Sequence, residues 1–118
     1  MTHAELLAAI MLEHSRGDTR LLRANVGRGW TGKIVYQDHN RITLSPYRPF
    51  HGHHEGVLDL LGWTGPYFVA VEGKVGRDRV RPAQQGFIDL VLSCGGRAGV
   101  ARSLDDARKI ITMETRHD

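Results

Sequence analysis

Apolar residues recur at helical spacing in three stretches of the chain, and this periodicity predicts three helices. The first covers residues 4–14. The second begins at Pro82, which suits the first position of a helix, and ends at the glycine pair 95–96. The third follows Ser103, a favourable N-cap, and its predicted buried positions are Leu104, Ala107, Ile110 and Ile111.

Shorter apolar runs between these helices predict strands. They cover residues 19–26, 57–62, 67–75 and 98–102, and the middle two are expected to form a β-hairpin around a turn at 63–66. Residues 27–49 are interpreted as irregular, with a second hairpin pairing 33–37 with 41–44. Without this second hairpin the order is α-β-β-β-α-β-α, which predicts one α/β domain spanning residues 1–118, with a mixed central sheet flanked by helices.

Composition says more about where the protein is found than about what it does. A formal net charge of +3 and a pI near 9.4 suit a polyanionic partner without identifying one. Cys94 is the only cysteine, which excludes an internal disulfide and a thiolate metal cage. Nowhere do about 18 uncharged apolar residues run together, so we expect no membrane span, no secretion signal and a cytoplasmic location.

Three charged residues stand in segments that should be buried. Alternation along strand 67–75 places Glu72 and Lys74 on the same face. Asp59 interrupts the apolar run 57–61, where an unpaired carboxylate would cost several kcal/mol. Two carboxylates and an ammonium on adjacent strands suggest an active site, whereas an isolated Glu-x-Lys in a strand is more often a structural ion pair.

The order of three short motifs carries a family resemblance: Gly56-Val57-Leu58-Asp59, Glu72-Gly73-Lys74 and Gln84-Gln85-Gly86-Phe87. In this order they resemble the VRR-NUC family, the virus-type replication-repair nucleases, a branch of the PD-(D/E)xK superfamily. The resemblance spans residues 56–111 and extends weakly to 23–27. It implies a restriction-endonuclease-like core and phosphodiester hydrolysis. Leu58 departs from the pattern, since the family often has proline before the aspartate.

The resemblance also implies roles for individual residues. Asp59, Glu72 and the backbone carbonyl of Gly73 would bind Mg²⁺ or Mn²⁺, ions that suit oxygen ligands. Lys74 would orient or help deprotonate the attacking water, and Gln84 would support that water or Lys74.

Related nucleases also place a glutamate of the first helix near the metal. Glu5 is the candidate here, although Glu13 is an equally anonymous carboxylate on the same predicted helix.

Branched or flapped DNA is the substrate that the resemblance implies, in the cytoplasm of a bacterial or phage-infected cell. A chain this small suggests a homodimer for a four-way (Holliday) junction. The predicted phosphate-contacting residues are Arg28, Lys33, Arg77, Arg79 and Arg81, with Arg41 and Arg48 nearby, and a solvated charged loop is the competing interpretation. The alternative function is a non-catalytic nucleic-acid-binding module with a nuclease-like fold.

Two further patterns carry little weight. Residues 27–32 match G-x-G-x-x-G and 27–33 match G-x-x-x-x-G-K, but Ile34 stands where a P-loop needs Ser or Thr, and residues 34–36 favour a strand where both motifs need a helix. The histidines at 51, 53 and 54 are interpreted as part of a polar loop beside the active site and less readily as a metal cluster.

Overall fold

A four-stranded mixed sheet forms the centre of the body of the protein. The computed structural model describes residues 1–24, 28–51 and 56–114, except for the side chains of 28–30 and 49–51. The strands are β1 (Thr19–Arg23), β4 (Leu60–Thr64), β5 (Tyr67–Gly73) and β6 (Arg97–Ala101), in the order β1-β4-β5-β6. The pairs β1–β4 and β4–β5 are antiparallel, and β5–β6 is parallel. The predicted α/β class with a mixed sheet is therefore confirmed.

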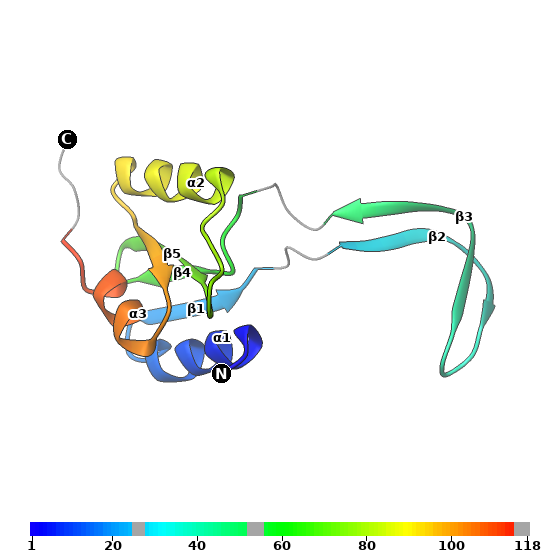
Figure 1. Ribbon diagram of the computed structural model, residues 1–118, viewed down its shortest axis with the longest axis horizontal. Helices are drawn as coiled ribbons and strands as arrows, with labels where there is room; N and C mark the ends of the chain where they lie inside the picture. Colours follow the sequence, from blue (N-terminus) through cyan, green and yellow to red (C-terminus); the bar gives the residue numbers. More distant parts are fainter. Residues whose placement is uncertain (25–27, 52–55, 115–118) are drawn as a thin grey trace.

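Helices cover both faces of this sheet (Figure 1). Helices α1 (His3–His14) and α3 (Leu104–Ile111) pack on one face, and α2 (Pro82–Ser93) packs on the other. Strand β5 serves both layers because its side chains alternate: Val69 and Val71 join the α1/α3 core, and Ala70 joins the α2 core. Among the described helices, none is long and apolar enough to cross a membrane.

The helices begin where the sequence predicts, because their caps are encoded locally. The hydroxyl of Thr2 accepts a hydrogen bond from Glu5 N, and the Glu5 carboxylate accepts one from Thr2 N, a complete capping box. Ser103 caps α3 in the same way by accepting from Asp106 N. One prediction here is wrong: Leu104, at the N-terminal end of α3, is 38% exposed, whereas Ala107, Ile110 and Ile111 are buried.

Strand β4 begins later than predicted. Residues 57–59 precede it, so Asp59 lies at the entrance of the strand and not within it. The hairpin turn is Gly65-Pro66, with Thr64 opposite Tyr67, and Gly65 takes a positive φ of 56° that favours glycine. Strand β1 ends at Arg23, and the rest of its predicted extent is partly outside the described residues.

A second, two-stranded sheet projects from the body (Figure 1). It consists of β2 (Arg28–Gln37) and β3 (Ile42–His51), which pair antiparallel from Arg28 opposite His51 to Gln37 opposite Ile42. The predicted hairpin is thus confirmed but is much longer than expected, and the region interpreted as irregular is mostly strand. Because a strand occupies residues 28–37, the helix that a P-loop or dinucleotide motif needs after its glycines does not form there.

Candidate active site

The predicted catalytic residues converge at the end of β5. Asp59 approaches from the segment before β4, Glu72 lies on β5, Lys74 follows that strand, and Gln84 lies in the first turn of α2. Hydrogen bonds or an ion pair connect each of them to another member of the group. The sequence therefore predicted a set of residues that the fold does bring together.

Glu72 is the centre of this cluster and is only 3% exposed. Its Oε1 accepts a hydrogen bond from the backbone N–H of Asp59 at 3.1 Å. Its Oε2 accepts one from Gln84 Nε2 at 2.7 Å and lies 3.2 Å from Lys74 Nζ. Both oxygens are thus held in place by donors from three different segments.

Asp59 is fixed by donors to one of its two oxygens. Oδ2 accepts a hydrogen bond from Gly73 N at 3.0 Å and lies 2.9 Å from Nε2 of His3, at the start of α1. Among the residues the structure describes, no hydrogen bond or ion pair reaches Oδ1. One carboxylate oxygen therefore keeps its lone pairs for a ligand.

The charges in this cluster do not balance. Burial raises the pKa of Glu72 above its ordinary value, and the nearby charge of Asp59 raises it further. The hydrogen bond and positive charge of Lys74 act in the opposite direction but do not reverse the shift. Lys74, beside Glu72, and His3, beside Asp59, are the basic side chains in contact with these two carboxylates among the described residues.

Local sequence explains why the side chains point as they do. Pro82 starts α2, and Gln84 two residues later turns back so that its Oε1 accepts from Arg81 N at 3.0 Å. This contact directs the amide nitrogen toward Glu72. At Gly73 a Cβ would lie 2.7 Å from Leu7 Cδ2, so glycine allows α1 to pack closely against β5 beside the site.

The structure gives the acidic candidates of α1 local partners. Glu5 is exposed and forms the capping box with Thr2, and Glu13 lies 3.8 Å from Arg16 in an exposed pair. A metal role for Glu5 remains a prediction that these contacts do not support. Helix α1 instead reaches Asp59 through His3, which the sequence analysis missed. No sequence signal marks this histidine, because 56 positions separate the two residues.

The predicted phosphate-contacting residues fall into two groups. Arg77, Arg79 and Arg81 are exposed in the loop between β5 and α2. Arg102 holds this loop near β6 by donating to the carbonyls of Gly76 and Asp78. The second group lies on the β2–β3 hairpin and includes Lys33, Arg41 and Arg48. The side chains of Arg28 and His51, and residues 52–55 with the other two histidines, lie outside the described part.

Comparisons with known proteins add no relative. No family model matches the chain, and a search of curated proteins finds no match. Within the described residues, no group of three or more His, Cys, Asp or Glu side chains is arranged to hold a metal ion. The acidic side chains that meet at this site are those of Asp59 and Glu72.

Proposed function

We propose that the protein is a metal-dependent DNA endonuclease with a PD-(D/E)xK-type core, in which Asp59, Glu72 and Lys74 form the catalytic centre. The supporting observation is the cluster itself: the Glu72 carboxylate accepts from Asp59 N, the Asp59 carboxylate accepts from Gly73 N, and the Lys74 ammonium lies beside Glu72. The motif order that resembles the VRR-NUC family supports the same assignment.

A structural ion pair is the competing explanation. Such a pair needs one carboxylate for Lys74, and Glu72 already supplies it at 3.2 Å. Asp59 has its own contact with His3 at 2.9 Å, but its negative charge raises the pKa of Glu72, which a pair that only stabilises the fold does not require. Perturbed pKa values of this kind cluster at functional sites.

The residues present fit a divalent cation with oxygen ligands. Mg²⁺ commonly binds through one or two carboxylates and keeps several waters, which agrees with a site holding two acidic side chains. Asp59, with its unbonded Oδ1, and Glu72 would hold the ion, and the Gly73 carbonyl is the predicted backbone ligand. When bound, the ion would lower the pKa of a water and offset charge on the phosphodiester.

The protein's own side chains would prepare the substrate and the water. The Lys74 ammonium would orient the attacking water and offset the negative charge that develops on the phosphate. Gln84 would keep the Glu72 carboxylate in one orientation by donating to Oε2. His3 would hold Asp59 through Oδ2, which leaves Oδ1 directed to the site.

We further propose branched DNA as the substrate and a homodimer as the active form. Exposed apolar side chains support the second point: Trp63 and Phe68 are cross-strand neighbours and are 47% and 45% exposed. A singly exposed aromatic is ordinary, but an adjacent pair on a small domain is a reasonable contact surface.

Cleavage assays with linear, flapped and four-way junction DNA, each with Mg²⁺, Mn²⁺ or EDTA, test this proposal. Asp59→Asn should lower the cleavage rate by at least about 100-fold, the effect of removing one key electrostatic group. The variant should stay folded and bind DNA, because Asp59 is not part of the apolar core. Glu13→Gln is the matched control and should cleave normally.

The outcomes separate the alternatives. Full activity of Asp59→Asn would remove the proposed site. DNA binding in EDTA with no cleavage under any metal condition would favour the non-catalytic binding module.

A further inference from the structure

The β2–β3 hairpin carries the whole basic surplus of the chain. Residues 28–51 contain four arginines or lysines and one aspartate, a net charge of +3, which equals the formal net charge of all 118 residues. The rest of the chain is therefore neutral overall. A body without net charge and a basic projection suit a polyanion that contacts the projection.

The hairpin is not built to stabilise the body. Its two strands pair only with each other, and every side chain from residue 31 to 43 is exposed. These include the apolar side chains of Ile34, Val35 and Ile42. An isolated two-stranded ribbon is marginally stable in water, so a ribbon with ten-residue strands gains from a binding partner.

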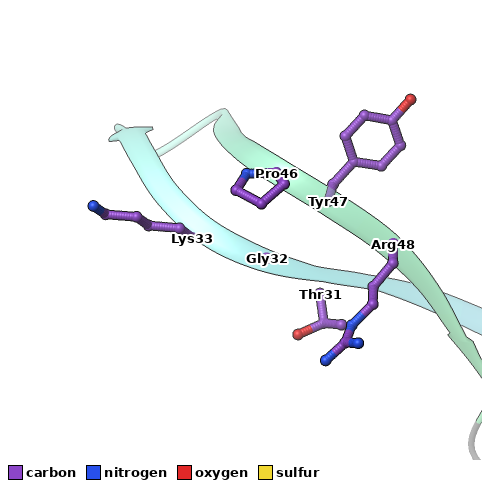
Figure 2. A pocket seen from close by; sticks show the side chains of 6 residues that line it. All are labelled: Thr31, Gly32, Lys33, Pro46, Tyr47 and Arg48. Atoms are coloured by element: carbon purple, nitrogen blue, oxygen red, sulfur yellow. The ribbon is translucent and has the colours of Figure 1, made fainter.

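One stretch of the hairpin gathers hydrogen-bond donors. Thr31 lies opposite Arg48 in the register, and Figure 2 shows their side chains on the same side of the ribbon, with Tyr47 on the other. Lys33 lies two residues along, at a register shift, and lines the same pocket of about 430 Å³. Among the described residues that line this pocket, none is acidic.

Glycine makes the close approach of the strands possible at this point. A Cβ on Gly32 would lie 2.1 Å from the carbonyl oxygen of Pro46. The backbone of β3 therefore lies against β2 where the two cationic side chains begin. The basic residues are consequently carried on a defined ribbon and not on a loose loop.

We propose that the hairpin is a DNA-binding arm in which Thr31, Lys33 and Arg48 contact the phosphate backbone of a duplex. Two cations and a hydroxyl are the donors that proteins commonly direct at phosphate oxygens. Strands of ten residues are about 33 Å long, close to one turn of duplex DNA. The choice of DNA rests on the proposed function, but the arm acts away from the cleavage site.

Binding measured without cleavage tests this inference. Fluorescence anisotropy in EDTA would follow binding of a four-way junction to the full-length protein across a range of salt concentrations. The test variant is Lys33→Gln/Arg48→Gln. The control is Arg108→Gln/Lys109→Gln, which removes the same charge from an exposed part of α3.

The hairpin variant should bind DNA at least about 10-fold more weakly. The slope of the logarithm of its binding constant against the logarithm of the salt concentration should become less steep by about 2, since each lost phosphate contact removes about 0.9. The control should keep the wild-type slope. Equal losses in both variants would overturn the inference, because total charge would then explain them. Unchanged DNA affinity of the hairpin variant would also overturn the inference. If that variant kept its affinity but became monomeric, the hairpin would be a contact with a second copy of the chain.

Failure of this inference and failure of the proposed function give different results. If the wild type cleaves DNA and the hairpin variant binds DNA normally, the DNA-binding arm is rejected and the nuclease proposal stands. If the wild type binds DNA through Lys33 and Arg48 but never cleaves it, the nuclease proposal is rejected and the DNA-binding arm is supported.

Discussion

At the scale of single residues, Glu72 belongs both to the candidate active site and to the buried interior of the protein. It is buried, and its partner Lys74 is only 9% exposed. On the proposed function alone, Glu72→Ala would be expected to remove cleavage and leave the fold intact, because a metal ligand need not support the core. The structure shows otherwise, since the alanine variant would leave a buried ammonium without its carboxylate, a loss of about 3–5 kcal/mol. Glutamine is the better substitution.

The raised pKa of Glu72 gives the stability of the protein a defined pH dependence. Because the fold favours the protonated form of Glu72, this side chain contributes its full stabilisation of the folded state at pH values below its ordinary pKa of 4.5. The contribution is lost as the pH rises through the higher pKa of the folded state. Relative to Glu72→Gln, the wild type should therefore lose unfolding free energy as the pH rises above 4.5. Urea denaturation in EDTA measures it.

An exposed carboxylate with the opposite shift provides the control. The hydrogen bond and charge of Arg108 lower the pKa of Asp105 below 3.8, so its contribution is present above that value and is lost as pH falls through the folded-state pKa. Asp105→Asn should consequently show the reverse trend, at more acidic pH. A difference in unfolding free energy between the wild type and Glu72→Gln that does not change as the pH rises above 4.5 would contradict the electrostatic account of the site.

At the scale of secondary structure, two glycines of the body have opposite roles. Gly62 on β4 lies opposite Leu21 of β1, and a Cβ there would come 1.8 Å from the carbonyl oxygen of Arg20. Gly86, inside α2, is exposed. Apart from the backbone of its own helix and its chain neighbours, no atom lies within 4 Å of the place where a Cβ would stand. The first glycine allows a close backbone approach, whereas the second only weakens a helix.

Alanine substitutions should separate these roles. Gly62→Ala should destabilise the protein by at least about 2 kcal/mol, because a rigid backbone carbonyl opposes the added methyl group. Gly86→Ala should stabilise it by about 0.5–1 kcal/mol through helix propensity. Thermal or urea unfolding of both variants measures the difference. Similar effects of the two substitutions would show that the β1–β4 packing differs from that described.

Sequence reasoning succeeded for elements with one buried face. The alternation in β5 predicted that Glu72 and Lys74 would lie together, and Ser103 and Pro82 marked helix starts because caps act within a few residues. It predicted the hairpin of β2 and β3 but not its length, because the described side chains of these strands are mostly exposed on both faces and show no alternation. The His3–Asp59 contact was also beyond reach, since it depends on how α1 packs across the sheet.

At the scale of the whole molecule, the charge and the candidate chemistry occupy different places. The body holds the buried carboxylates in a part of the chain with no net charge, and the hairpin holds the basic surplus. The molecule is elongated because the hairpin projects from the body, with extents of 54 × 31 × 29 Å (Figure 1). In the proposed nuclease, affinity for DNA would therefore depend mainly on the hairpin, and the rate of cleavage mainly on the body.

Assembly is the property of the whole molecule that the proposed substrate constrains most. Cutting both strands of a four-way junction at related positions needs two catalytic centres, and each chain carries one Asp59-Glu72-Lys74 set. A two-fold dimer supplies both. The aromatic pair on β4 and β5, Trp63 and Phe68, is the proposed contact, and exposed Leu90 of α2 shares a pocket with Phe68.

Light scattering at micromolar concentration should give about twice the chain mass of 13.2 kDa, and junction cleavage should yield paired symmetric nicks. Trp63→Ser/Phe68→Ser should halve the measured mass while circular dichroism stays unchanged, because both side chains are already partly in water. The control is Leu12→Ser on α1, since Leu12 is 80% exposed but lies away from the proposed contact. This variant should remain a dimer, and its dissociation would place the interface on α1. A wild-type monomer that nicks flaps and leaves four-way junctions uncut would contradict the dimer and the junction substrate, while the chemistry assigned to Asp59, Glu72 and Lys74 would stand.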